Sequence, residues 1–99
     1  MKIDVYKFYS KKHNDIVISQ LEFAKAYDDV EEWSALQSII LGFAFVMDVD
    51  YDFTIDNYNS IYSALAPNAK IVFSADKKTR TLLVRVLSAN HNIKYCATL

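Results

Sequence analysis

The stretch GFAFVMDVDYDFTID, residues 42–56, is the most regularly patterned segment of this 99-residue chain. Apolar side chains occupy every odd position from Phe43 to Ile55, whereas the later even positions carry Asp48, Asp50 and Asp52. Strict alternation places the two sets on opposite faces of an extended strand. The pattern therefore predicts a strand over 43–55 with one buried face and, on the other, a row of aspartates spaced about 6.5–7 Å apart.

The residues before this strand have the signals of a helix. Acidic residues at 28–32 favour a helix start, and apolar residues at helical spacing continue to Leu41. Gly42, the only glycine in the chain, is the expected left-handed residue that ends the helix. A helix that continues to Met47 is the alternative, because a short apolar run does not decide between helix and strand.

The rest of the chain predicts strands joined by polar turns, with two further helices. The predicted strands cover 2–9, 16–18, 70–75, 80–87 and 93–98, where 16–18 is short enough to be only a lead-in. Ser19 and Glu22 match a capping box that opens a short helix, and Asp56 is the expected N-cap of a helix that reaches Leu65. The order β-α-α-β-α-β-β-β predicts a single α+β domain over 1–99. We expect a largely antiparallel sheet of four to five strands, with two or three helices packed on one face.

The composition argues against an enzyme. One cysteine, Cys96, excludes an internal disulfide and a multi-cysteine zinc site, and one glycine leaves no glycine-rich phosphate loop. His13 and His91 lie in predicted turns without neighbours at metal-ligand spacing. The longest apolar run, 39–47, is too short to span a bilayer. The sequence therefore predicts a non-enzymatic cytoplasmic protein with no cofactor, no metal and no membrane association.

The aspartates at 48, 50 and 52 also match the opening of a calcium-binding EF-hand loop. The sixth loop position, which needs glycine for a sharp turn, is Phe53, and the twelfth, which needs a bidentate glutamate, is Asn59. Both departures remove what the loop needs, so the sequence predicts no calcium site.

Charge divides the chain into an acidic part and a basic part. Residues 14–56 carry ten acidic side chains and one base, whereas residues 66–99 carry six bases and one acid. The acidic candidate for partner binding consists of Glu31, Glu32, Asp48, Asp50, Tyr51, Asp52, Asp56 and Tyr58. The basic candidate, which could bind nucleic acid, consists of Lys70, Lys77, Lys78, Arg80, Arg85 and Lys94. Lys11 and Lys12 could join this second group.

These features are similar in kind to those of small inhibitor proteins, although no motif carries the likeness. Such proteins include immunity proteins and phage-encoded inhibitors of host nucleases or CRISPR complexes, some of which mimic nucleic acid. The likeness implies a viral-type inhibitor whose acidic surface occupies the basic site of a protein partner. The alternative is a nucleic-acid-binding domain that works through the basic hairpin at 70–87.

Overall fold

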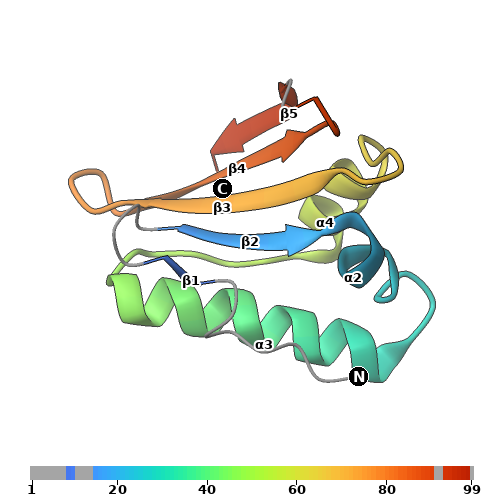
Figure 1. Cartoon of the computed structure of the whole chain (residues 1–99). Coiled ribbons are helices and arrows are strands. Elements are labelled where there is room, and N and C mark those ends of the chain that lie inside the picture. The colour runs from blue at the N-terminus through green and yellow to red at the C-terminus, as the bar shows by residue number, and fades with distance from the viewer. Residues whose placement is uncertain (1–8, 11–14, 91–92, 99) are drawn as a thin grey trace.

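The computed structural model describes residues 9–10, 15–90 and 93–98, and in this part of the chain it confirms the α+β class. Five strands form one antiparallel sheet in the order β1-β2-β3-β4-β5 (Figure 1). The strands are β1 Tyr9–Ser10, β2 Asp15–Ser19, β3 Lys70–Asp76, β4 Thr81–Leu87 and β5 Ile93–Thr98. The helices are α2 Gln20–Ala24, α3 Val30–Met47 and α4 Ile55–Tyr62.

Some sequence predictions fall where the structure gives no description. Of the predicted strand over 2–9, only Tyr9 is described, and it belongs to β1. Lys11, Lys12, His13 and His91 lie outside the described residues.

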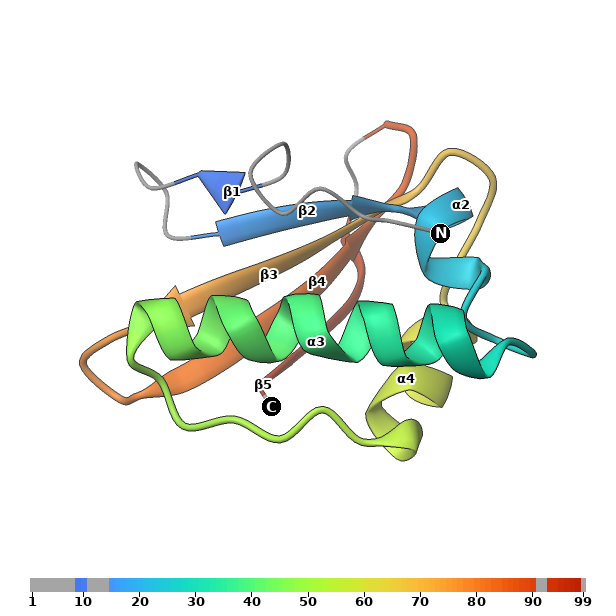
Figure 2. The ribbon, with the colours of Figure 1, turned by 90° about the horizontal axis from the view of Figure 1, so that it is seen from below.

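The strands predicted at 16–18, 70–75, 80–87 and 93–98 are confirmed, with ends that shift by one residue at most. In the centre of the sheet Phe73 pairs with Ile16 on one side and with Val84 on the other. Their side chains are fully buried, and so are four others on the same face of β2, β3 and β4: Ile18, Ile71, Leu82 and Val86. Helix α3 lies across this face (Figure 2) and covers the apolar core.

The strand predicted over 43–55 is wrong, because α3 continues to Met47. Leu36, Ile40, Phe43 and Met47 are all buried, and their spacing of four, three and four residues is that of one helical face. Gly42 lies on the exposed side of the helix and does not have a positive φ angle. The alternative of a continuous helix was therefore the right one, since packing on the sheet outweighs the roughly 1 kcal/mol helix penalty of a glycine.

Asp48 has the role that the sequence analysis assigned to Gly42, that of the left-handed residue at the end of the helix. It is the C-cap of α3 in the left-handed conformation, with φ 55°, and its amide donates to the carbonyls of Ala44 and Phe45. Aspartate tolerates this conformation better than most residues do. Glycine was therefore not needed to end the helix.

Residues 49–54 lie outside the helices and strands of the described structure but retain the alternation that the sequence shows. Val49 and Phe53 are buried and Tyr51 is half-buried, whereas Asp48, Asp50 and Asp52 are exposed. The segment runs back along α3 (Figure 2), where the Gln37 side-chain amide donates to the Phe53 carbonyl over 3.1 Å. An extended chain on the edge of a core thus buries alternate residues without joining a sheet.

Two of the three helix starts lie where the sequence placed them. Ser19 caps α2 by accepting from the Glu22 amide, and Asp29 caps α3. Helix α4 begins two residues earlier than expected, because Thr54 and Asn57 form a reciprocal capping box. Asp56 is therefore a first-turn residue and not the N-cap.

Candidate functional site

Tyr58 is a core residue, which corrects its assignment to a binding surface. Its side chain is 1% exposed, its ring stacks on Phe23 at 4.5 Å, and its hydroxyl donates to the Phe23 carbonyl over 2.8 Å. Burial raises the pKa of the Tyr58 phenol, and the neighbouring Tyr62, Tyr27 and Asp28 add to the rise. Tyr58 therefore joins α4 to α2 and is not available to a partner.

Tyr51 is also directed toward the core. Its ring stacks near Phe53 at 6.2 Å, and its hydroxyl is buried without a hydrogen-bond partner among the residues that the structure describes. Burial raises the pKa of this phenol, and the negative charge of Asp52 raises it further. The sequence placed Tyr51 on the acidic surface, whereas the structure leaves it with little exposed area.

Arg80 connects the two surfaces that the sequence treats as separate. Its guanidinium Nη2 lies 3.2 Å from Asp50 Oδ1 and 3.6 Å from Asp48 Oδ1, and the Asp50 amide donates to the Arg80 carbonyl over 3.1 Å. The hydrogen bond to Asp50 raises the pKa of Arg80, as do the charges of the two aspartates. Two of the predicted acidic residues are thus partly neutralised by one of the predicted basic residues.

The calcium-binding alternative for residues 48–59 can be compared with the structure. In the described part of the chain, no group of three or more potential metal-ligating side chains gathers at one point. A helix does precede and another does follow residues 48–54, as the EF-hand alternative requires. The intervening chain is nevertheless extended, and Phe53 at its sixth position is fully buried in the core.

Six exposed carboxylates are without an ion pair among the described residues, and one of them, Asp76, lies at the end of β3. The other five lie near the starts of α3 and α4 and are named here the acidic end: Asp28, Asp29, Glu31, Asp52 and Asp56. Stacking of Trp33 on Phe53, with ring centres 5.4 Å apart, brings the segment that carries Asp52 and Asp56 beside this part of α3. Glu32, the remaining predicted member, is only partly exposed.

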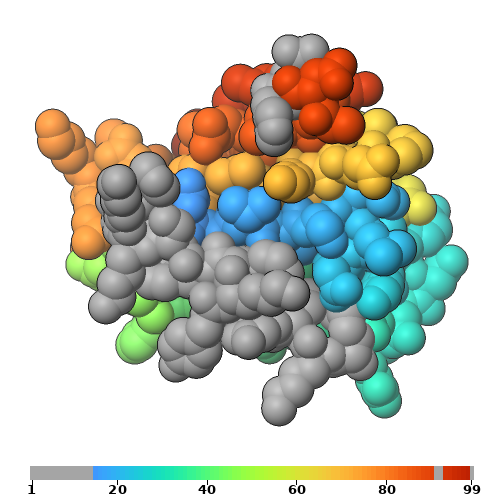
Figure 3. Space-filling model, in the orientation of Figure 1, coloured from blue at the N-terminus to red at the C-terminus, as the bar shows by residue number. Residues whose placement is uncertain are grey.

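The predicted basic residues do not form one patch. Lys70 begins β3 while Lys77 follows its last residue, so about 20 Å of strand separates them. Lys77 and Lys78 lie in the β3–β4 turn, which projects from one end of the molecule (Figure 3). Arg85 donates to the Ser74 hydroxyl over 3.3 Å on β3. Lys94 lies on β5, at the edge of the sheet.

The outward side of α3 is the feature that sequence reasoning missed. Phe45 is 87% exposed and Val30 80% exposed, and Leu41 and Val46 are also exposed. The strand interpretation had placed Phe45 in the core, so continuing the helical spacing past Gly42 was the signal that could have found it. By length and composition α3 could cross a membrane, and in the described structure its inward side packs on the sheet.

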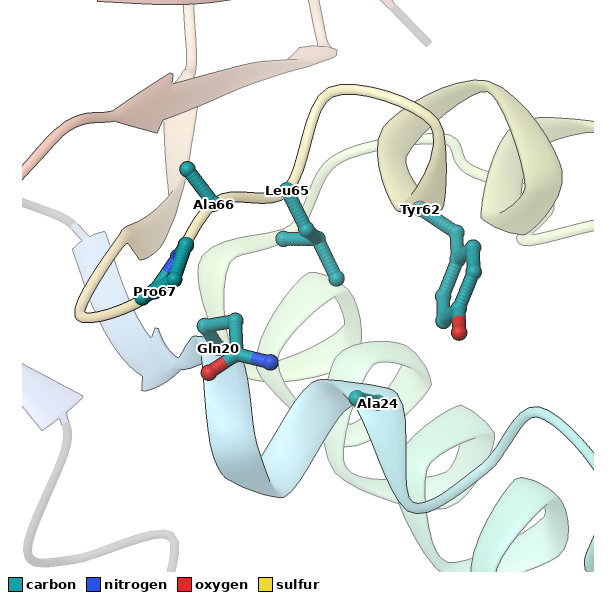
Figure 4. Close-up of a pocket in the computed structure, with 6 residues that line it drawn as sticks. All are labelled: Gln20, Ala24, Tyr62, Leu65, Ala66 and Pro67. Atoms are coloured by element: carbon teal, nitrogen blue, oxygen red, sulfur yellow. The ribbon is translucent and has the colours of Figure 1, made fainter.

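A small hollow lies between α2 and the chain that follows α4. It has a volume of about 260 Å³ and is lined by Gln20, Ala24, Tyr62, Leu65, Ala66 and Pro67 (Figure 4). The polar side chains among these residues are one amide and one phenol, so the lining provides no carboxylate, imidazole or thiol for catalysis.

Comparison of the chain with protein-family models, with curated proteins and with solved structures finds no match. Function is therefore inferred from the surfaces described above.

Proposed function

We propose that this protein is a non-enzymatic binding protein whose acidic end occupies a basic site on a protein partner. The observation that carries the proposal is the group of five exposed carboxylates that have no ion pair among the described residues. The only basic residue between 14 and 56, Lys25, is already engaged with Glu22 over 3.2 Å. The acidic end therefore keeps its charge for an external partner.

The charge suits an inhibitor of a protein that normally binds nucleic acid. A nuclease or a CRISPR complex presents a basic channel, and carboxylates at this density would compete there with phosphates. Such complementarity acts mainly by accelerating association, and it weakens as salt is added. In this proposal Glu31, Asp52 and Asp56 are direct contacts, whereas Asp48 and Asp50 contribute less because Arg80 shares their charge.

Nucleic-acid binding by the basic hairpin is the second candidate. It is favoured by Lys77 and Lys78, which are exposed in a projecting turn and have no ion pair in the described part of the chain. It is disfavoured by the wide separation of the remaining bases and by the engagement of Arg80 with aspartates.

The experiment compares two charge variants of the full chain. One combines Asp28→Asn, Glu31→Gln, Asp52→Asn and Asp56→Asn and leaves Asp29 intact because it caps α3. The matched control combines Lys77→Gln and Lys78→Gln. We expect the first variant to lose a partner that the wild type captures from host extract, with a slower association rate and a weaker salt dependence in surface plasmon resonance. The control should bind as the wild type does.

The opposite result would assign function to the basic hairpin. In that case the wild type would retard random-sequence oligonucleotides in a gel, the effect would fall steeply with salt, and the lysine variant would lose it. Capture that is equal in both variants would exclude an electrostatic interface.

A further inference from the structure

The outward side of α3 is unusually poor in charge for a surface helix. Its exposed positions lie on one side of the helix: Val30, Glu31, Ser34, Ser38, Leu41, Gly42, Phe45 and Val46. Only Glu31, in the first turn, carries a charge, and no charged residue occurs between Trp33 and Met47. A surface helix in contact only with water usually has charged and polar residues on this side. This face is therefore suited to contact something other than water.

The face is apolar in its second half and bounded by carboxylates at both ends. Glu31 and the rest of the acidic end lie at its start, and Asp48 and Asp50 lie at its finish. The helix is about 27 Å long, while the molecule measures 32 × 30 × 26 Å. The face thus extends along most of one side of the protein, as Figure 2 shows.

These charges select the kind of partner. If a second copy packed on α3 with the helices parallel, the acidic end of one copy would meet the acidic end of the other. If the helices were antiparallel, the acidic end would meet Asp48 and Asp50, which share the single positive charge of Arg80. Anionic lipid would meet the same repulsion. A surface with apolar residues at its centre and basic residues on both sides would satisfy the whole face.

We propose that the outward face of α3 is the centre of the partner interface. It takes a protein segment whose apolar ridge is flanked at both ends by lysine or arginine. This proposal rests on the proposed function and adds to it an apolar anchor, because the most strongly buried contacts of an interface are enriched in aromatic side chains and surrounded by a polar rim. Phe45 is the anchor, and the carboxylates at the two ends form the rim.

The experiment uses three synthetic helical peptides with the same leucine and phenylalanine ridge. One carries lysines at both ends, one glutamines and one glutamates, and binding to the full chain is measured by fluorescence anisotropy. We expect the lysine peptide to bind, the glutamine peptide to bind more weakly, and the glutamate peptide to bind at least about tenfold more weakly than the lysine peptide.

Two variants test the place of binding. Phe45→Ser removes the anchor from a position that contributes little to the core, and Gly42→Lys puts a charge where an added Cβ meets nothing within 4 Å. Each substitution should reduce the affinity for the lysine peptide by about tenfold or more. Ile55→Ser, at a residue of α4 that is 56% exposed, is the matched control and should change nothing. Thermal melts should show all three variants folded.

The outcomes separate this proposal from the proposed function. Binding that depends on peptide charge but ignores Phe45→Ser and Gly42→Lys would overturn the α3 assignment and leave the acidic function standing. Binding that is lost in both variants but is equal for all three peptides would overturn the acidic function and the partner chemistry proposed here. Binding by no peptide also overturns the proposal, as does a wild-type dimer or vesicle binding that Phe45→Ser abolishes.

Discussion

Arg80 and Asp50 are thirty residues apart in sequence and are joined by two interactions in the structure. The Arg80 guanidinium donates to the Asp50 carboxylate over 3.2 Å, and the Asp50 amide donates to the Arg80 carbonyl over 3.1 Å. The β3–β4 turn is thereby attached to the chain that leaves α3. The basic hairpin and the aspartates of residues 48–52 are consequently neighbours, not opposed surfaces.

Arg80→Gln tests how much of this attachment is electrostatic. Because the pair is largely exposed, we expect a small fall in the urea midpoint at low salt. No difference should remain at about 1 M NaCl, where the screening length is about 3 Å. The backbone hydrogen bond from Asp50 should survive the substitution. A large loss that persists in high salt would show that the side chain holds the turn by more than charge.

Gly42→Ala should stabilise the protein by up to about 1 kcal/mol, because alanine is the better helix former and the added Cβ meets nothing within 4 Å. Urea unfolding measures the gain, and Ser34→Ala, at another exposed position of α3, should show a smaller one. Destabilisation would mean that residue 42 adopts a left-handed conformation and that the helix ends there.

Thr54→Ala should cost about 1 kcal/mol of stability, because the Thr54 hydroxyl accepts from the Asn57 amide as the N-cap of α4. Asp56→Glu is the control, because glutamate keeps the negative charge in the first turn but is a poor N-cap. Since Thr54 and not Asp56 caps α4, the unfolding free energy of Asp56→Glu should equal that of the wild type. A larger loss for Asp56→Glu than for Thr54→Ala would move the start of α4 to residue 57.

Alkaline pH should unfold the protein through its buried tyrosines. The pKa values of Tyr51 and Tyr58 are raised in the folded state, chiefly by burial, so the folded state retains these protons after the unfolded state has lost them. The stability that these two buried phenols contribute should be fully present below the unfolded tyrosine pKa of about 10, and it should be lost as the pH rises above that value.

Tyrosine absorbance measures this effect. At least two of the seven tyrosines should ionise only when circular dichroism shows loss of structure. Tyr58→Phe should make the decline less steep. It removes one donor to the Phe23 carbonyl, which also accepts from the Ala26 amide, and should lower stability at neutral pH by about 0.5–1.5 kcal/mol. Ionisation of all seven near pH 10 in a folded protein would contradict the burial of both phenols.

Local patterns in the sequence determined much of the architecture. The alternation in β2, β3 and β4 identified strands whose inward residues, such as Ile16, Phe73 and Val84, fill the core. Ser19 and the acidic residues before Trp33 marked two helix starts correctly, because a cap depends on side chains within three residues of the amides it satisfies. The α+β class follows from these elements, since three helices must cover one face of an antiparallel sheet.

Tertiary structure alone decided the segment from Gly42 to Asp56. An alternating pattern shows which residues seek burial, but an extended chain lying along a helix buries them as well as a strand does, as Val49 and Phe53 demonstrate. The same holds for the helix: Phe43 faces the sheet while Phe45 faces solvent, because the sheet provides one core and a helix can turn only one side toward it. The partnership of Arg80 with Asp50 likewise depends on how the chain folds back, since contacts between residues so distant in sequence leave no local signal.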